Sequence, residues 1–333
     1  MKNTFKLITL LIFTSNIVWS HDIHRPNIQA FIENMATKHN FDKKELSNIL
    51  LNSTSKEKIL NAISRPAEKM LTWDEYRNIF LKEKRINAGA KFWKEHQVTL
   101  NRISGQTGVS IEILVGIIGV ETYFGRITGG YRVIDALTTL AFDYPKRSSF
   151  FTNELEAFLL LTKEENMDPF DATGSYAGAM GSPQFMPSSY RAYAIDSDGD
   201  GKRDIWKNWS DVIGSIANYF IAHGWQQGNE VIVPAFENDV IASGVITIKN
   251  GLKATETVIS LKSKGISFDT NMRQDHPAEL LHLEQKNSNN YWVAMHNFFV
   301  ITKYNHSIMY GLAVHQLGQE IAVKFKRLNA GNI

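Results

Sequence analysis

The strongest structural pattern in the chain lies in residues 110–121, which read Ser110-Ile-Glu-Ile-Leu-Val-Gly-Ile-Ile-Gly-Val-Glu121. Ser110 is a good N-cap, and Glu112 in the first turn suits the positive end of a helix dipole. The apolar residues that follow surround the helix and leave no polar face, which is typical of a helix buried in a protein core. We therefore predict a central buried helix from which Glu121 emerges at the C-terminal end.

Glu121 in this position is a candidate for acid–base chemistry. Burial and the negative end of the helix dipole both raise a carboxyl pKa. A carboxylic acid that stays protonated at neutral pH is what the cleavage of a glycosidic bond requires. The alternative is a glutamate that simply leaves the core and enters solvent. Position alone favours that alternative, so the assignment depends on the motifs that follow.

The regions around this helix differ in pattern. Residues 22–104 have the spacing of amphipathic helices, as at Ile28, Phe31, Ile32 and Met35. Helical spacing returns from residue 308 to residue 325. Between them, residues 231–236 and 245–248 are short β-branched runs, and residues 280–285 and 291–295 flank a polar segment that predicts a hairpin. The pattern indicates a mostly helical protein with a small β unit inserted late.

A second motif contains small residues and two prolines. It reads Asp171-Ala-Thr-Gly-Ser-Tyr-Ala-Gly-Ala-Met-Gly-Ser-Pro-Gln-Phe-Met-Pro-Ser-Ser-Tyr190. Small residues around Gln184 let a bulky ligand approach the backbone. The amide of Gln184 can then orient sugar hydroxyls or an acetamido group.

Together these segments resemble the membrane-bound lytic murein transglycosylase B family. The resemblance rests on Gly119-Val-Glu-Thr-x-x-Gly125 and Gly174-Ser-x-Ala-Gly-Ala-Met-Gly-x-x-Gln-Phe-Met-Pro-Ser-Ser189. It continues through Trp73-x-Glu-Tyr-Arg77, Tyr144-Pro-Lys-Arg147, Ile216-Ala-Asn-Tyr-Phe220 and Ile301-Thr-x-Tyr-Asn-His306. Each motif is weak alone, but their succession in the right order over nearly the whole chain is specific.

The resemblance implies an α+β, mostly helical fold, in which a lysozyme-like core is combined with a helical domain and a small inserted β unit. We expect a signal peptide at residues 1–20 and a helical domain at residues 21–104 that the C-terminal helix 308–333 joins. A catalytic core with a calcium loop is expected at residues 105–229. A small β domain that returns to the cleft is expected at residues 230–307.

The resemblance also implies functions for single residues. Glu121 matches the catalytic glutamate, which protonates the glycosidic oxygen after N-acetylmuramic acid. Ser175 matches a serine that positions the sugar, and Gln184 matches a glutamine that lines the same cleft. The residues that match the lining of the glycan groove are Tyr76, Tyr304, Asn305 and Tyr310. For the tyrosines the alternative is core packing with the hydroxyl at the surface, and that alternative is stronger for Tyr76 than for Tyr304.

Two positions depart from the family pattern. Lys146 and Arg147 stand where the family often has two arginines. A basic pair here can meet lactyl or peptide carboxylates of the substrate, but lysine lacks the bidentate geometry of arginine. Phe150 stands where the family often has tyrosine, which removes one hydroxyl contact.

The sequence offers only one carboxylate for the reaction. Most glycosidases use two, whereas Asp135 and Asp143, which follow Glu121, read as structural. In the family, the N-acetyl oxygen of the substrate stabilises the anomeric centre and the C6 hydroxyl attacks it. The expected product of cleaving the β-1,4 bond is therefore a 1,6-anhydro-N-acetylmuramic acid end. The alternatives are a hydrolytic muramidase on the same fold and a non-catalytic glycan-binding or calcium-binding module.

An acidic loop, Asp196-Ser-Asp-Gly-Asp-Gly-Lys-Arg-Asp204, has the ligand spacing of an EF-hand. Its ligands would be Asp196, Asp198, Asp200 and the carbonyl of Lys202. Position 12 holds Lys207 instead of glutamate, and the resemblance implies Asp211 as the final ligand of a lengthened loop. Because these carboxylates repel one another without a cation, we predict a structural Ca²⁺ site. The alternative is a solvated acidic turn.

The N-terminus has the pattern of an export signal. Lys2 and Lys6 precede an uncharged apolar run that ends near Trp19; the alternative is an uncleaved anchor. Removal of residues 1–20 takes away two lysines and no acid, which leaves 34 basic and 34 acidic residues. A neutral chain has no overall field that would attract nucleic acid. With no cysteine, the chain cannot carry a thioether lipid anchor.

We therefore expect a soluble periplasmic monomer whose partner is the glycan strand of peptidoglycan, with no organic cofactor. Partners in a cell-wall remodelling complex are left open. Four histidines lack metal-ligand spacing and are predicted to lie at the surface or to cap helices, namely His21, His24, His223 and His306.

Overall fold

The computed structural model describes residues 19–64, 71–236, 248, 250–284 and 289–330. Most of the predicted signal peptide and most of the β-branched run 245–248 lie outside these residues. The described part of the chain is mostly helical with short antiparallel sheets, and the predicted fold class is confirmed. No single helix in the described residues is long and apolar enough to cross a membrane. The helices Gln97–Thr107 and Ile111–Thr122 meet the length and composition criteria only as a pair, and that pair is bent by 118°.

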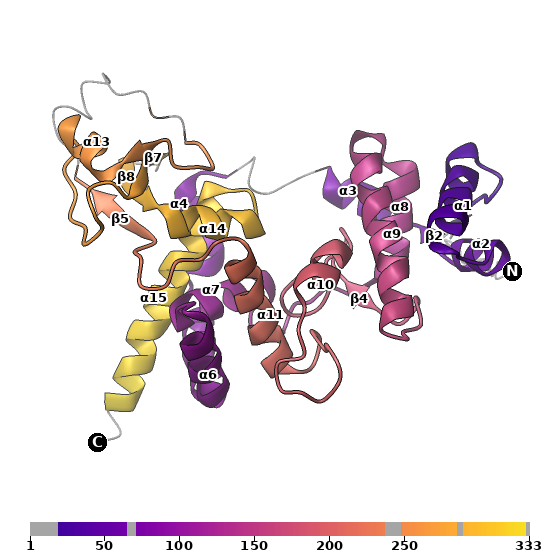
Figure 1. Ribbon diagram of the computed structural model, residues 1–333, viewed down its shortest axis with the longest axis horizontal. Coiled ribbons are helices and arrows are strands. Elements are labelled where there is room, and N and C mark those ends of the chain that lie inside the picture. The colour runs from indigo at the N-terminus through magenta and orange to yellow at the C-terminus, as the bar shows by residue number, and fades with distance from the viewer. Residues whose placement is uncertain (1–18, 65–70, 237–247, 249, 285–288, 331–333) are drawn as a thin grey trace, which may run out of the picture.

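One hydrophobic core joins the beginning of the chain to its middle. Its helices are α1 (Pro26–His39), α2 (Lys43–Leu51), α3 (Glu57–Ile63), α8 (Val133–Asp143), α9 (Ser148–Glu164) and α10 (Pro187–Tyr193). The amphipathic pattern predicted for α1 is confirmed, because Ile28 and Met35 are fully buried. Figure 1 shows α1, α2, α8 and α9 together on the side of the molecule that carries the N-terminus.

A second core surrounds the predicted central helix. Its helices are α5 (Glu83–Glu95), α6 (Gln97–Thr107), α7 (Ile111–Thr122), α11 (Trp209–Ala222) and α15 (Ile308–Ala330). Residues 113–120 of α7 are all buried, which is the result expected for a helix without a polar face. Ser110 is the N-cap residue of α7, but its side chain makes no capping hydrogen bond.

The β unit is a four-stranded antiparallel sheet with the order β5-β8-β7-β6. Its strands are β5 (Ile232–Ala235), β6 (Glu256–Thr257), β7 (Pro277–Glu284) and β8 (Asn289–Met295). Strands β7 and β8 pair from Ala278 with Met295 to Glu284 with Asn289, so the predicted hairpin is present. Helices α4 (Trp73–Phe80), α13 (Val258–Ser263) and α14 (His296–Tyr304) accompany the sheet, and α4 lies close to it in Figure 1.

Helix α15 packs against α7 at very short range. A Cβ atom on Gly116 would lie 2.4 Å from the carbonyl oxygen of Val314, and one on Gly318 would lie 2.1 Å from that of Glu112. These two pairs show that the helices are antiparallel and that their backbones touch where glycine removes the side chain. The beginning of α15 is thereby brought to the C-terminal end of α7.

The two cores group the helices differently from the predicted domain at residues 21–104. Helices α1 to α3 pack with α8 and α9, whereas α5 and α6 pack with α7 and α15. The domain boundaries at residues 104, 229 and 307 stay a prediction, because packing into a shared core does not by itself define a domain.

Candidate active site

Glu121 receives a hydrogen bond from a tyrosine of another helix. The hydroxyl of Tyr310 donates to Glu121 Oε1 over 2.5 Å. Tyr310 is 2% exposed, while Glu121 is half-buried in the last turn of α7. The close packing of α7 and α15 produces this contact, because it brings the first turn of α15 next to the last turn of α7.

The backbone directly after α7 has an unusual conformation. Tyr123, Phe124 and Gly125 have φ angles of 52°, 59° and 76°, in the left-handed region that bulky residues rarely adopt. This conformation costs Tyr123 and Phe124 about 1–3 kcal/mol each, whereas Gly125 adopts it freely. Thr122 holds the turn, since its hydroxyl donates to the carbonyl of Ser182 over 3.0 Å and accepts from the N–H of Gly125 over 3.1 Å. The chain therefore leaves α7 along a fixed path next to Glu121.

Two arginines contact the side chain of this turn. The guanidinium groups of Arg85 and Arg126 lie 4.8 and 4.9 Å from the centre of the Tyr123 ring. Arg85 also lies 5.1 Å from the centre of the Phe80 ring. Such cation–π contacts are worth about 0.5–2 kcal/mol, depending on burial. They fix Tyr123 two residues beyond the catalytic candidate.

Tyr304 lies beside the same carboxylate. Burial, and then the negative charge of Glu121, raise the pKa of Tyr304 and of Tyr310 well above the usual phenol value. Both tyrosines therefore remain protonated hydrogen-bond donors. The hydroxyl of Tyr304 donates to the carbonyl of Pro183 over 2.6 Å, which links this tyrosine to the loop of Gln184.

The motif of small residues forms a tight loop that fixes Gln184. The side-chain nitrogen of Gln184 donates to the carbonyls of Gly181 and Thr128, over 2.9 and 3.1 Å. Both N–H groups of an amide nitrogen are used in this way, so the carbonyl oxygen of Gln184 is the atom left to face a ligand. It can accept a hydrogen bond from a sugar hydroxyl or from an acetamido N–H group.

Ser175 stands at the start of the same motif. Its Oγ accepts hydrogen bonds from the N–H groups of Ala177 and Ala179, over 3.2 and 3.1 Å. With both acceptor positions occupied, the hydroxyl proton is available for donation to a ligand. Strand β4 (Thr173–Gly174) precedes Ser175 and pairs with β3 (Tyr131–Arg132), which directly precedes α8.

The remaining predicted residues have different surroundings. Tyr76 on α4 is 3% exposed and packs against Trp73 and Phe80, and it lies near enough to Tyr310 to contribute to the raised pKa of that phenol. Asn305 is half-buried at the C-cap of α14, directly after Tyr304.

Lys146 and Arg147 form an exposed 3₁₀ turn, η2 (Pro145–Arg147), between α8 and α9. The guanidinium of Arg147 lies 4.4 Å from the centre of the Phe150 ring, the ring that stands in place of the family tyrosine. Arg147 also lies over Phe151 of the first core, whereas the helix that carries Glu121 belongs to the second.

Asp135, the first of the two acids downstream of Glu121, is fully buried between two cations. Lys56 Nζ and Arg132 Nη2 each lie 2.8 Å from its carboxylate. Burial alone would raise the pKa of Asp135, but hydrogen bonds from Arg132, Lys56 and the N–H of Thr54 outweigh it and lower the pKa. This carboxylate holds α8 to the segment before α3.

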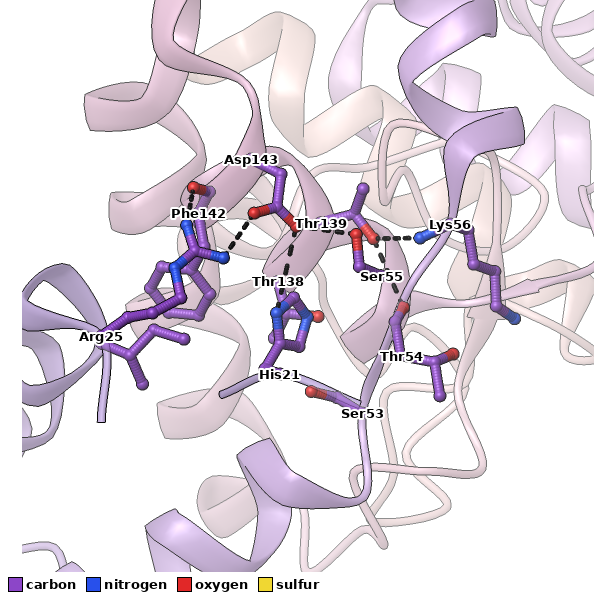
Figure 2. Close-up of polar contacts among 12 residues, drawn as sticks. His21, Arg25, Ser53, Thr54, Ser55, Lys56, Thr138, Thr139, Phe142 and Asp143 are labelled. Atoms are coloured by element: carbon purple, nitrogen blue, oxygen red, sulfur yellow. Dashed lines mark hydrogen bonds and ion pairs between the residues drawn. The ribbon is translucent and has the colours of Figure 1, made fainter. Parts of the chain in front are cut away.

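Asp143, the second of these acids, ties the beginning of the chain to the end of α8. Figure 2 shows its bonds to Arg25, at 2.6 Å, and to Ser55, at 2.7 Å. His21 also faces Asp143 and is only 3% exposed, so the prediction that it lies at the surface or caps a helix is wrong. Burial lowers the pKa of His21, while Asp143 opposes that effect. Local spacing could not reveal this long-range contact.

The acidic loop brings together four carboxylates. One oxygen atom from each lies within 4.8 Å of the others, and the residues are Asp196, Asp198, Asp200 and Asp211. Asp204, at loop position 9, instead accepts hydrogen bonds from the N–H groups of Trp206 and Lys207. Lys202, the predicted carbonyl ligand, is held by a 2.9 Å bond from its N–H to Asp200.

Asp211 is the fully buried member of this cluster. Burial raises the pKa of Asp211, and the negative charges of Asp198 and Asp196 add to this effect. Hydrogen bonds from the N–H groups of Ser197 and Asp204, each 2.8 Å long, act in the opposite direction. A concentrated set of oxygen donors of this kind suits Ca²⁺.

Several residues near Glu121 were not predicted. Thr122 and Ser182 connect the turn after α7 to the small-residue loop, and the side-chain oxygen of Ser182 is buried without a hydrogen-bond partner among the described residues. The Nη1 atom of Arg85 is also buried without a hydrogen-bond partner among the described residues. Ser182 lies inside the motif that was singled out, but nothing in local sequence indicates Arg85.

The sequence of this chain matches a known protein family over most of its length. A family model described as the transglycosylase SLT domain matches residues 24–319. Membrane-bound lytic murein transglycosylase B of Escherichia coli (strain K12) is 41% identical over 309 residues, which cover 90% of this chain and 84% of that protein.

Solved structures are similar over the same length. The soluble lytic transglycosylase SltB1 from Pseudomonas aeruginosa is 46% identical, with a TM-score of 0.84 over 90% of this chain and 99% of that one. The Escherichia coli lytic transglycosylase Slt35 in complex with calcium is 41% identical, with a TM-score of 0.83 over 92% and 96%. SltB3 from Pseudomonas aeruginosa, in complex with NAG-anhNAM-pentapeptide, is 25% identical, with a TM-score of 0.77 over 90% and 80%.

Proposed function

This chain belongs to the transglycosylase SLT domain family and is a lytic transglycosylase that acts on peptidoglycan; from this premise we propose that Glu121 is its single catalytic acid and base. The observation that supports the assignment most directly is the 2.5 Å hydrogen bond from Tyr310 to Glu121 at the end of a buried helix. A half-buried carboxyl group that a buried phenol holds in place is suited to proton transfer.

The proposed reaction begins with Glu121 in its protonated form. Glu121 gives its proton to the glycosidic oxygen, the bond from that oxygen to C1 of N-acetylmuramic acid breaks, and the leaving sugar departs with a new hydroxyl group. The N-acetyl oxygen of the substrate stabilises the positive anomeric carbon. The C6 hydroxyl then attacks C1, and the Glu121 carboxylate takes its proton. The product is a 1,6-anhydro end, and no water is consumed.

The first two acids downstream of Glu121 are both engaged elsewhere, which favours this course. A hydrolytic enzyme would use a second acid to activate water or to attack C1. Asp135 and Asp143 are both held in ion pairs with lysine and arginine side chains. An intramolecular attack also has the advantage of proximity. The hydrolytic muramidase and the non-catalytic binding module are therefore not favoured.

The other polar side chains predicted for the site would hold the sugar. Ser175 would donate its hydroxyl proton, and Gln184 would accept through its carbonyl oxygen, as their backbone bonds leave these functions free. Tyr304 and Asn305 follow each other at the end of α14, and the pKa of Tyr304 responds to the Glu121 charge. We assign them, with Tyr76, to the lining of the glycan groove.

Lys146 and Arg147 would contact a more distant part of the substrate. They are exposed beside the first core, so they suit a carboxylate of the lactyl group or of a peptide rather than the reacting sugar.

The acidic loop would hold a structural Ca²⁺. Its four clustered carboxylates and the Lys202 carbonyl are oxygen donors of the type that Ca²⁺ prefers. The solved Slt35 complex with calcium supports the same assignment. Burial, and then repulsion from Asp198 and Asp196, raise the pKa of Asp211, and the cation would neutralise that repulsion.

The cellular setting follows from the substrate. We propose that residues 1–20 are a signal peptide and that the mature chain works in the periplasm as a monomer on glycan strands. The charge balance and the absence of cysteine support a protein without a nucleic-acid partner and without a thioether lipid anchor.

The replacement Glu121→Gln tests the catalytic assignment. Glutamine keeps the shape of the side chain but cannot donate a proton to the glycosidic oxygen. Turnover of purified peptidoglycan should fall by at least the ~10²–10⁴ that general acid catalysis contributes. Glu112→Gln, in the first turn of the same helix, is the matched control and should keep full activity. Activity of a folded Glu121→Gln variant at the wild-type level rejects the assignment.

A further inference from the structure

A pocket outside the catalytic centre opens between α4, the end of β7 and the start of α15. Its volume is about 440 Å³. The residues that define its character are Leu71, Trp73, His282, Glu284, Ile308 and Met309. None of them has been assigned to the reaction.

The same two helices line this pocket and the catalytic centre. On α4, Trp73 in the pocket stacks on Tyr76, with ring centres 6.4 Å apart. On α15, Met309 in the pocket directly precedes Tyr310, which holds Glu121. Met309 and Tyr310 are neighbours on α15, and Trp73 and Tyr76 lie about one turn apart on α4, so the pocket borders the residue that holds Glu121.

The lining suits a peptide better than a further sugar. Leu71, Ile308 and Met309 give an aliphatic surface, and all three are half-buried. Trp73 is only 2% exposed, so its ring offers little free face for a sugar to stack on. The ring of His282 is stacked on Tyr291, with centres 4.8 Å apart. The aromatic groups of this region are therefore already occupied.

The rim of the pocket carries a negative charge on a rigid edge. Glu284 is exposed at the end of β7. Two residues earlier, the backbone of His282 exchanges two hydrogen bonds with the Asn250 side chain, over 2.8 and 2.9 Å. The carboxylate of Glu284 is thus presented from a fixed strand and is complementary to an ammonium group.

We propose that this pocket binds the peptide stem that N-acetylmuramic acid carries in peptidoglycan. The aliphatic surface receives small apolar side chains of the stem, and Glu284 pairs with a free amino group on it. This proposal rests on the proposed function, since it assumes that the glycan lies across Glu121. It makes the pocket the site at which the enzyme distinguishes peptide-bearing strands from bare ones.

The test compares two substrates and three variants. The substrates are glycan strands that carry stems with a free amino group and the same strands after an amidase has removed the stems. Wild-type enzyme should have the lower KM on the peptide-bearing strands. Glu284→Gln should raise that KM about twofold to fivefold, the range expected for an exposed ion pair, and should leave the KM on bare strands unchanged. Leu71→Trp fills the pocket and should remove the preference altogether.

Glu83→Gln, an exposed acid on α5 outside the pocket, is the control and should behave as wild type on both substrates. Thermal melting identifies a variant that does not fold. If Leu71→Trp does not fold, Glu284→Gln still tests the proposal, because Glu284 is exposed and its replacement should not disturb folding. Equal KM values on the two substrates for an active wild-type enzyme, or losses of equal size on both substrates in Glu284→Gln, overturn the proposal. A wild-type enzyme that cleaves neither substrate instead rejects the proposed function.

Discussion

At the scale of single residues, the centre of the proposed site is a carboxylate that accepts a hydrogen bond from a buried phenol. Burial and the charge of Glu121 raise the pKa of Tyr310, so Tyr310 does not compete as an acid and serves only as a donor. Its hydrogen bond favours the ionised form of Glu121 and fixes the direction of the carboxyl group. Tyr310 is thus a positioning residue for the proton donor.

Removal of this hydroxyl gives a prediction with a defined sign. In Tyr310→Phe, the Glu121 carboxylate loses a donor, so its protonated form persists to higher pH. The alkaline limb of the pH–activity profile should move to higher pH. Because hydrogen bonds to charged groups are worth about 1.5–3 kcal/mol, kcat should fall by about tenfold to a hundredfold. The measurement is kcat against pH on soluble muropeptide chains.

Tyr304→Phe is the matched control, because the one hydroxyl proton of Tyr304 is donated to the Pro183 carbonyl. It should leave the alkaline limb in place. A Tyr310→Phe profile that coincides with the wild-type profile contradicts the positioning function.

The sequence alone could indicate Glu121 but not its partner. A glutamate at the end of a helix without a polar face is a local feature that the chain displays directly. Tyr310 lies 189 residues away, and only the resemblance to a family pointed to it. Arg85 and Thr122 were missed for the same physical reason: their contacts depend on how α5, α7 and the small-residue loop pack, which local spacing does not encode.

At the scale of secondary structure, the site depends on the contact between α7 and α15. Gly116→Val should disrupt it, since even the first carbon would lie 2.4 Å from a backbone carbonyl that cannot move independently. Overpacking of this kind costs about 1–3 kcal/mol. The melting temperature should fall, and activity should fall further than the melting temperature alone explains, because Tyr310 is displaced from Glu121.

Gly105→Ala is the control for this helix contact. A Cβ at that position of α6 meets nothing within 4 Å. Alanine in place of glycine in an exposed helix should stabilise by up to about 1 kcal/mol. Equal melting temperatures and activities for Gly116→Val and wild type contradict the account of the α7–α15 contact.

The acidic loop before α11 gives a prediction about calcium. A cation that binds only the folded chain stabilises it by about 2.7 kcal/mol at a hundred times its Kd. Calcium should therefore raise the melting temperature of the wild type relative to chelator. Asp200→Asn should lose most of this rise, whereas Asp204→Asn should keep it, because Asp204 lies outside the carboxylate cluster. Identical melting curves with calcium and with chelator leave only the solvated acidic turn.

The same loop predicts a dependence on pH. The folded-state pKa of Asp211 is raised, so in the absence of calcium its contribution to stability is fully present below the pKa of the unfolded chain and is lost as pH rises through the folded pKa. The calcium-induced rise in melting temperature should accordingly be larger at neutral pH than at pH 4. A rise that is larger at acid pH contradicts this explanation.

Elements were predicted more reliably than their packing. The periodicity of residues 110–121, the amphipathic start of α1 and the β7–β8 hairpin are all present in the structure. The attachment of α1 to α8 through Arg25 and Asp143 was not predicted, because an ion pair between residues far apart in sequence leaves no periodic signal.

At the scale of the whole molecule, the two large cores meet around the proposed site. Tyr304 packs against both of them, and Phe185 of the first core lies 5.9 Å from its ring centre. Helix α7 belongs to one core, while the loop that carries Gln184 is anchored in the other. This arrangement brings residues from distant parts of the chain to one carboxylate.

The central claim is that this one carboxylate, without a second acid, forms the product through the C6 hydroxyl of the substrate. Mass spectrometry of peptidoglycan digested by the wild-type enzyme tests it most directly. We predict muropeptides that end in 1,6-anhydro-N-acetylmuramic acid, lighter by one water than hydrolysis products and resistant to reduction by borohydride. Muropeptides whose muramic acid ends are all reducible by borohydride would contradict the account.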